Sequence, residues 1–443
     1  MLLLASYLFY GCWDWRFLGL IGASTLLDYW IAQAIDATTS LVRRRNYLVI
    51  SIIASMGTLA FFKYCNFFTQ EFQSLLGWLG LDFIVPRLEI ILPVGISFYT
   101  FQTMSYTIDV YRGKLPASRN LIDFALYVAY FPQLVAGPIE RATRLLPQIA
   151  SPRVPIPHGF AEGLYCVVLG IFKKVFVADS MAVIANGIFA TDTSELSALE
   201  VLLGVYAFAF QIYCDFSGYS SIAQGVSKWF GIELMDNFHT PYFSSNPSEF
   251  WQRWHISLSQ WLRDYVYIPL GGNRDGNLRT YCNLMTTMLL GGLWHGANWT
   301  YVLWGAYHGV LLCLFRALTP AQSSLRRSPQ SALEKSLAAI VFFQLVCVGW
   351  LIFRAESLQQ IIAMLSSLAT PWSLTPLSKA MIGMLLFYVA PLLLFESWAG
   401  DSSQKPRLLQ KHWSVRAVVY ALAVHLIIFF AAPTASQFIY FQF

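Results

Sequence analysis

The sequence predicts an all-α integral membrane protein with about ten to twelve transmembrane or re-entrant helices, and three observations support this fold class. Hydrophobic residues fill 56% of the 443 positions and charged residues only 12%, whereas soluble domains carry about 25% charged residues. The mean hydropathy is +0.52. The apolar runs are long enough to cross about 30 Å of hydrocarbon, and they lack the alternation of apolar and polar residues that membrane barrel strands show.

The apolar runs follow one another with short connections, so we expect one polytopic membrane domain over residues 1–443. The predicted spans are 16–34, 47–62, 89–108, 121–137, 159–190, 198–225, 281–294, 300–318, 336–353, 378–397 and 415–432. Segment 159–190 is long for one span, and we expect it to be broken. The opening MLLLASYLFYGCWDW lacks the basic start and small-residue cleavage site of a secretory signal, so we expect it to be retained.

The charged residues and the cysteines are scattered along the chain and are typical of a membrane protein. The net charge of +5 comes from scattered residues without a long basic block, so no nucleic-acid arm is predicted. Arg43, Arg44 and Arg45 follow the 16–34 span, and the positive-inside rule places them in the cytoplasm. The seven cysteines are spread singly through apolar segments, which favours packing over disulfides or zinc.

The stretch around residues 230–310 differs from the rest because Trp, His, Arg, Asn, Gly and Pro are concentrated there. We predict a helix from Ser248, capped by Asn246 or by Ser248 itself, with Pro247 in its first turn. One face of that helix would carry Trp251, Trp254, Leu258, Trp261 and Leu262. Such an aromatic, arginine-bearing helix either re-enters the protein near a site or anchors the fold at the membrane surface.

His295 lies in GGLWHGANWT, directly after the apolar run YCNLMTTMLL. An ionisable side chain at membrane depth costs about 2.5–3.5 kcal/mol on insertion scales and usually lines a cavity or pathway. The neighbouring glycines leave room for a ligand or another backbone. If the turn is helical, Asn298 and Trp299 share the face of His295, and Asn298 fixes the imidazole tautomer. Burial favours the neutral imidazole, which is able to accept a proton.

His255 is the second candidate, with Ser259 and Arg263 four and eight residues later. It either contributes to a site or is a hydrated interfacial residue. We expect His308 to be structural, and the intramembrane Asp215 to bond Tyr213, Tyr219 or another helix. The sequence contains no HExxH or HxxxH pair and no GxSxG motif, so neither a metal site nor a serine nucleophile is predicted.

Long segments of the chain resemble the membrane-bound O-acyltransferase family, and within it the members that acetylate bacterial polysaccharides such as alginate. The segments that carry the resemblance are FPQLVAGPIER (131–141), GIFKKVFVADSMA (170–182), the block from YCDFSGYSS through NPSEFWQRWHISLSQWLRDYVYIPLGGNR (213–274), LLGGLWHGANWTYVLWGAYHG (289–309) and the terminal FIYFQF. The resemblance implies an MBOAT-like ring of helices around a central tunnel, with residues 213–309 as the catalytic core. It also implies a further span before the element that matches LLLASYLFYGCWDW.

The resemblance assigns catalytic positions to His295, in the WHG element, and to His255. It implies no bound cofactor and no metal, but an acyl thioester donor, acetyl-CoA or an acyl carrier, as co-substrate from the cytoplasm. The acceptor is an extracytoplasmic partner protein or the polysaccharide itself, and the location is the bacterial cytoplasmic (inner) membrane.

The mechanism expected from these residues is an acyl transfer in which His295 acts as general base and His255 positions donor or acceptor. The tetrahedral oxyanion needs a hydrogen-bond donor. The candidates for substrate or oxyanion binding are Arg253, Arg263, Asn298, Trp294, Trp299 and a backbone N–H. Alternatives are D-alanyl or peptidoglycan acyl transfer by the same fold. A transporter that uses Asp215, Lys173 and Lys174, or a scaffold of a glycan assembly complex, belongs to a different class.

Overall fold

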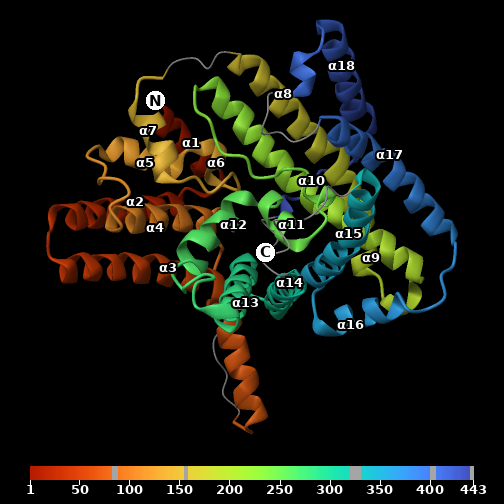
Figure 1. Cartoon of the computed structure of the whole chain (residues 1–443), viewed down its shortest axis with the longest axis horizontal. Coiled ribbons are helices and arrows are strands. Elements are labelled where there is room, and N and C mark those ends of the chain that lie inside the picture. Colours follow the sequence, from red (N-terminus) through yellow and green to blue (C-terminus); the bar gives the residue numbers. More distant parts are fainter. Residues whose placement is uncertain (82–87, 154–157, 320–330, 400–405, 440–443) are drawn as a thin grey trace. The chain divides into compact units, whose positions relative to one another are not determined.

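The computed structural model describes residues 1–81, 88–153, 158–319, 331–399 and 406–439, and no strand occurs in these ranges. The predicted all-helical fold is therefore confirmed (Figure 1). The described residues divide into two compact units, residues 1–157 with 227–235, and residues 158–226 with 236–443. The expectation of one polytopic domain stays a prediction.

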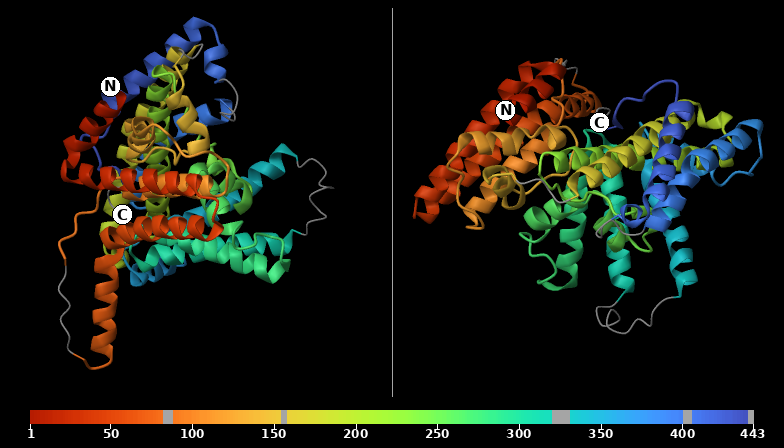
Figure 2. Two further views of the ribbon diagram at one scale, coloured as in Figure 1. Left: turned by 90° about the vertical axis from the view of Figure 1, so that its left-hand side faces the viewer. Right: turned by 90° about the horizontal axis from the view of Figure 1, so that it is seen from above.

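The first unit consists mainly of helices near the start of the chain. These are α1 (Leu2–Asp14), α2 (Arg16–Ala37), α3 (Leu41–Trp78), α4 (Ile96–Tyr111), α5 (Leu121–Ala129), α6 (Phe131–Leu134) and α7 (Ala142–Ala150). Helices α2, α3 and α4 pack on one another, and Figure 2 shows α2 and the first part of α3 side by side. The buried Asp28 of α2 accepts hydrogen bonds from Ser51 of α3 at 2.5 Å and Thr107 of α4 at 3.1 Å. The Asp28 carboxylate therefore links α2 to α3 and α4 by hydrogen bonds.

The second unit holds the remaining elements. Its helices are α8 (Gly159–Ile171), α9 (Asp179–Ala190), α10 (Ala198–Trp229), α11 (Pro247–Arg253), α12 (Ile256–Leu262), α13 (Gly276–His295), α14 (Trp299–Leu318), α15 (Ala332–Arg354), α16 (Leu358–Ser367), α17 (Pro376–Ala399) and α18 (Trp413–Phe430). Its short elements are the π-helices η1 (Phe172–Ala178) and η4 (Arg263–Tyr267) and the 3₁₀ turns η2 (Thr193–Glu195), η3 (Pro241–Phe243) and η6 (Arg407–Gln410). The end of α10, from Ser227, belongs to the first unit.

Seven helices of the described chain are long and apolar enough to cross a membrane, namely α2, α3, α10, α14, α15, α17 and α18. Four predicted spans are not among them. Segment 89–108 becomes helical only after Gly95, whose φ is 74°, and 121–137 divides at Tyr130, before Pro132. Segment 159–190 stays helical throughout, because the π-helix η1 joins α8 to α9 without a gap, so a change of helix type stands where a break was expected. Helix α13 has 20 residues, but polar side chains such as Asn283 and Thr287 lower its hydropathy.

Buried ion pairs connect η1 with segments far away in the sequence. Lys174 contacts Asp179 at 2.9 Å and Asp215 of α10 at 2.7 Å. Asp179 accepts a hydrogen bond from the Ser436 hydroxyl at 2.5 Å, and Asp215 accepts one from the Ile439 backbone N–H at 2.7 Å. The expected bond from Asp215 to another helix is thus confirmed. Of the terminal FIYFQF, residues 440–443 lie outside the described residues.

A second ion pair lies beside the first. Lys173 contacts Glu396 of α17 at 2.8 Å, and the hydroxyl of Tyr213 donates to the same carboxylate at 2.6 Å. Buried charges are tolerated when they are paired and hydrogen-bonded. Both lysines of η1 therefore have a structural role, which is to hold α10, α17 and the segment around residues 436–439 together.

Candidate active site

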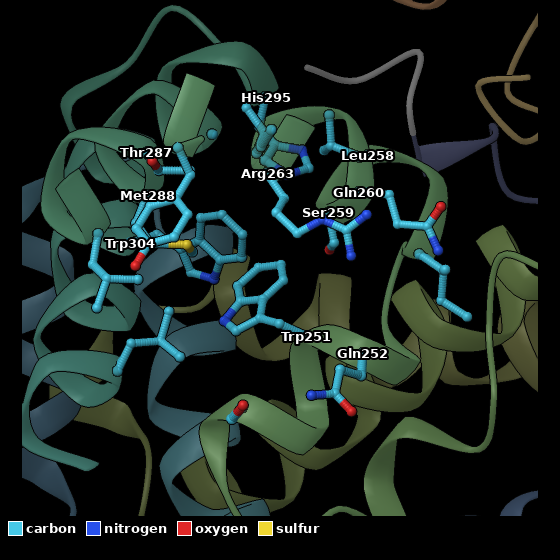
Figure 3. Close-up of a pocket in the computed structure, with 17 residues that line it drawn as sticks. Trp251, Gln252, Leu258, Ser259, Gln260, Arg263, Thr287, Met288, His295 and Trp304 are labelled. Carbon is cyan, nitrogen blue, oxygen red and sulfur yellow. The ribbon is translucent and has the colours of Figure 1, made fainter. Parts of the chain in front are cut away.

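A pocket of about 420 Å³ lies within the second unit, between α11, α12, η4, α13 and α14. One wall is a stripe of α13 residues at positions i, i+3, i+4, i+7 and i+11, which share one helix face. They are Leu284, Thr287, Met288, Gly291 and His295. Trp304 of α14 and Trp251 of α11 close another side, and the polar side chains of Gln252, Ser259, Gln260 and Arg263 also line it. Figure 3 shows these side chains around the pocket.

His295 is the last residue of α13, and it lines the pocket with only 6% of its surface exposed. Three aromatic rings surround the imidazole edge-on. The ring centroids of Trp294, Trp304 and Phe353 lie 5.0, 5.1 and 5.2 Å from that of His295. Aromatic rings therefore cover three sides of the imidazole, and the pocket lies beside it. The prediction that His295 borders a cavity is confirmed.

The glycines near His295 permit close contact between α13 and α14, which lie side by side in Figure 1. A side chain at Gly292 would collide with the carbonyl oxygen of Tyr301, and one at Gly305 with that of Met288. At Gly296 a side chain would collide with the Tyr301 ring. The hairpin of α13 and α14 therefore requires these glycines, and it brings Trp304 against His295.

His255 is fully buried, at 0% exposure, and it is not among the residues that line the pocket. Its ring centroid lies 4.6 Å from that of Phe216 and 5.8 Å from that of Trp294, and Trp294 directly precedes His295. The structure therefore places His255 behind the pocket, where it contacts His295 through Trp294. A hydrated interfacial position is wrong for this residue.

The single helix predicted from Ser248 is wrong, because it breaks at Trp254 and His255. Asn246 does cap α11, since its side chain accepts from the Glu249 N–H at 2.9 Å, as predicted. His255, however, adopts the left-handed conformation with φ 41° and ψ 55°, which a helix interior does not allow. The break turns α12 so that Leu258, Ser259 and Leu262 line the pocket.

Asn298 and Trp299 do not share a face with His295, because α13 ends there and Gly296 is extended. The Asn298 side chain instead caps α14 and accepts from the Thr300 N–H at 3.0 Å. It donates to the Glu356 carbonyl at 3.4 Å. The idea that Asn298 fixes the imidazole tautomer is therefore wrong. Trp299 is 51% exposed and is not among the residues that line the pocket.

The other candidates are divided between the pocket and its surroundings. Arg263 lines the pocket and donates to Asp264 at 2.8 Å. Arg253 is paired with Glu249 at 2.9 Å and is absent from the lining. Trp294 is buried between the two histidines. Sequence reasoning missed Trp251, Trp304 and Met288 as lining residues. The three-to-four spacing back from His295 along α13 would have identified Met288.

His308 of α14 lies next to this site. It is fully buried, and its ring stacks 6.0 Å from that of Phe250 and meets those of Trp251 and Trp304 at 5.2 and 4.9 Å. It does not line the pocket. The expectation of a structural role agrees with this packing position.

The buried position of His255 predicts a pH-dependent contribution to stability. Burial, and after it the proximity of His295, hold the pKa of His255 well below its ordinary value of 6.5. The unfolded chain therefore binds this proton more readily than the folded protein. The stability contributed by neutral His255 is fully present above pH 6.5 and is lost as the pH falls toward the folded-state pKa.

We expect His255→Asn, which tolerates the left-handed conformation, to have a shallower loss of stability between about pH 6.5 and 5 than the wild type. The difference in slope approaches about 1.4 kcal/mol per pH unit, the value for one proton. Equilibrium unfolding of the detergent-solubilised protein at a series of pH values measures it. Equal slopes in the two proteins would mean that folded His255 already carries its proton.

The known proteins that this chain resembles are acyltransferases. Residues 112–355 match the model of the membrane-bound O-acyltransferase family. The probable alginate O-acetylase of Azotobacter vinelandii is 40% identical, and the similarity covers 100% of this chain and 94% of that protein. The peptidoglycan O-acetyltransferase of Helicobacter pylori is 33% identical over 100% of this chain and 91% of its own length. The teichoic acid D-alanyltransferase of Bacillus subtilis is 28% identical over 61% of this chain and 71% of its own length.

Proposed function

Because the chain belongs to the membrane-bound O-acyltransferase family, we propose that it carries an acetyl group from a cytoplasmic thioester to an extracytoplasmic polysaccharide such as alginate. The protein is a multi-pass membrane acyltransferase. The name of the alginate O-acetylase relative supports a polysaccharide as acceptor, and the proposal is that the acceptor is reached directly or through a partner protein. The proposal includes a place in the bacterial inner membrane and a ring of helices around a tunnel.

The observation that carries the proposal is the position of His295 in the pocket. A slightly exposed imidazole at the end of α13, enclosed by three aromatic rings, is suited to hold a proton briefly. The pocket of about 420 Å³ lies within the range of small-molecule sites, about 300–1,000 Å³. The pocket combines the His295 imidazole, the side-chain amides of Gln252 and Gln260, and the apolar α13 residues Leu284 and Met288. This mixture suits a reacting ester with polar and apolar flanking groups.

In the proposed reaction, the acceptor hydroxyl gives its proton to His295 while its oxygen attacks the thioester carbonyl carbon. A tetrahedral intermediate forms with a negative oxygen. It collapses by breaking the carbon–sulfur bond, and the departing thiolate takes the proton from the imidazolium. The products are an O-ester and a free thiol, and the histidine returns to its neutral form. No bound cofactor takes part, and the thioester, acetyl-CoA or an acyl carrier, is a co-substrate.

The negative oxygen requires a hydrogen-bond donor close to His295. Of the side chains that the sequence suggested for this role, Arg263 lines the pocket, and it is our candidate. Arg253 and Asn298 are engaged by Glu249 and by the start of α14. We assign His255 and Trp294 to positioning, because both lie behind His295.

A second candidate function is transfer of another acyl group, or transfer to another acceptor, by the same site. This candidate is supported by the two relatives named as a peptidoglycan O-acetyltransferase and a teichoic acid D-alanyltransferase. A transporter or a scaffold is less well supported. The lysines that suggested transport are paired with carboxylates in the described structure, so their charges have a structural explanation.

The test is the ester content of the exported glycans in a deletion strain and in the same strain complemented with the wild-type chain. We expect loss of O-acetyl groups from a polysaccharide in the deletion strain and recovery on complementation. Loss of D-alanyl esters, or of acetyl from peptidoglycan, would instead support the second candidate. Unchanged esters on every glycan would contradict acyl transfer to a glycan.

A further inference from the structure

The turn that carries His255 is held by a residue outside it, Asn237. The backbone N–H of Ile256 donates to the Asn237 carbonyl oxygen at 3.0 Å. The backbone N–H and the hydroxyl of Ser257 both donate to the Asn237 side-chain oxygen, at 3.2 and 2.9 Å. The two residues that follow His255 are thereby fixed by one asparagine.

His255 needs such a brace because its own conformation is unfavourable. Its φ is 41°, and the left-handed region is sterically unfavourable for a residue with a Cβ. A conformation of this kind persists only when the surroundings determine it. Before the turn, the His239 N–H donates to the Arg253 carbonyl oxygen at 2.9 Å. Residues 237–239 therefore bracket Trp254 and His255 from both sides.

The brace is itself anchored on α10. The Asn237 side-chain amide donates to the Ser220 hydroxyl at 3.3 Å, and both residues are almost fully buried, at 2% and 3% exposure. Ser220 lies one helical turn after Phe216, whose ring receives the His255 imidazole edge-on at 4.6 Å. Helix α10 thus supplies both the anchor for Asn237 and the surface on which His255 rests.

We propose that Asn237 is a positioning residue of the active site, acting through His255 and Trp294 on the orientation of His295. This inference rests on the proposed function of His295. The chain of contacts runs from Asn237 to the 255–257 turn, then from the His255 ring to Trp294, and finally to His295. An amide is required at residue 237, because its oxygen accepts from Ser257 while its nitrogen donates to Ser220.

The experiment compares Asn237→Ala with Asn246→Ala in the purified full-length protein. Asn246 is a matched control, since it is an asparagine of the same region that accepts a backbone N–H at 2.9 Å, to cap α11, and no described contact joins it to His255. With acetyl-CoA as donor and an alginate oligosaccharide as acceptor, we expect Asn237→Ala to lower kcat by about 100-fold, the effect of a misplacement of about 1 Å. The KM values stay within about threefold, and Asn246→Ala keeps the wild-type kcat.

A double-mutant cycle with His255→Asn tests the route of the effect. If Asn237 acts through His255, Asn237→Ala lowers kcat far less in the His255→Asn background than in the wild type. Equal factors in both backgrounds would contradict the proposed route. A wild-type kcat in Asn237→Ala at matched folded fraction would overturn the role altogether.

A readout that needs no acyl transfer separates this inference from the proposed function. Diethyl pyrocarbonate modifies accessible neutral imidazoles, and peptide mass spectrometry measures its rate at His295. We expect a changed rate in Asn237→Ala and an unchanged one in Asn246→Ala. If the wild type transfers no acetyl but this difference appears, the proposed function fails and the positioning role stands. Equal rates in all three proteins would overturn the positioning role.

Discussion

Replacement of His295 by glutamine or alanine lowers acyl transfer by about 10²–10⁴-fold, the contribution of a general base. Both changes remove the group that accepts the proton of the acceptor hydroxyl, and glutamine keeps much of the imidazole's bulk against Trp304 and Phe353. The protein therefore folds and inserts into the membrane normally. The measurement is the initial rate of ester formation by purified protein at saturating acetyl-CoA, scaled to the folded fraction.

His425 supplies the control for this experiment, because it lies exposed on α18 and outside the pocket lining. We expect His425→Gln to keep the wild-type rate. A wild-type rate in folded His295→Gln would remove the general-base mechanism and leave the pocket with a binding role. A rate that falls only in step with the folded fraction would make His295 a structural residue.

The largest effect on stability is expected where α13 and α14 touch by their backbones. In Gly305→Ala the new methyl group meets the carbonyl group of Met288, and in Gly292→Ala it meets that of Tyr301. A backbone carbonyl group cannot change its position by rotating, as a flexible side chain can. Helices α13 and α14 must therefore move apart. Overpacking of this kind costs about 1–3 kcal/mol and sometimes more. Thermal unfolding in detergent measures the effect, and we expect the acyl-transfer rate to fall as well, because Trp304 moves away from His295.

Gly187→Ala is the matched control, since a methyl group at this α9 position meets nothing within 4 Å. There alanine is expected to stabilise the helix by about 0.5–1 kcal/mol. Gly309→Ala tests the distinction on α14 itself, because its nearest neighbour is the flexible side chain of Met285, and a smaller loss is expected. If Gly305→Ala and Gly187→Ala unfold at the same temperature, the close backbone contact is not needed for stability.

Composition and periodicity were sufficient to predict the helical membrane fold, because the bilayer permits few alternatives to long apolar helices. The cap at Asn246 was also predictable, since it depends on neighbouring residues alone. The glycine- and tryptophan-rich surroundings of His295 predicted its place at a cavity. Whether His295 and His255 take part in catalysis stays a prediction.

Two local conformations could not be predicted because they depend on contacts that a helical pattern does not show. The helix broken at His255 has a continuous apolar pattern, and the left-handed turn is held by contacts with residues 237–239, of which Asn237 lies 20 residues from Ser257. At the end of α13, the Tyr301 ring occupies the space beside Gly296, a contact that the helical pattern of the sequence does not show. The pattern of apolar residues in a sequence indicates which residues share a helix face. It does not indicate which other residues of the chain contact the helix and interrupt it.

The charged cluster around η1 has a consequence for the order in which the protein is made. Asp179 and Ser436 are separated by 257 positions, so at about 5–20 residues per second the ribosome supplies the serine roughly 13–50 s after the carboxylate. During this interval Asp179 and Asp215 can already pair with Lys174, but they lack the hydrogen bonds that Ser436 and the Ile439 N–H donate in the complete protein. A chain cut short before the segment around residues 436–439 would leave both carboxylates short of a hydrogen-bond donor, a local defect by which membrane proteases recognise an incomplete product.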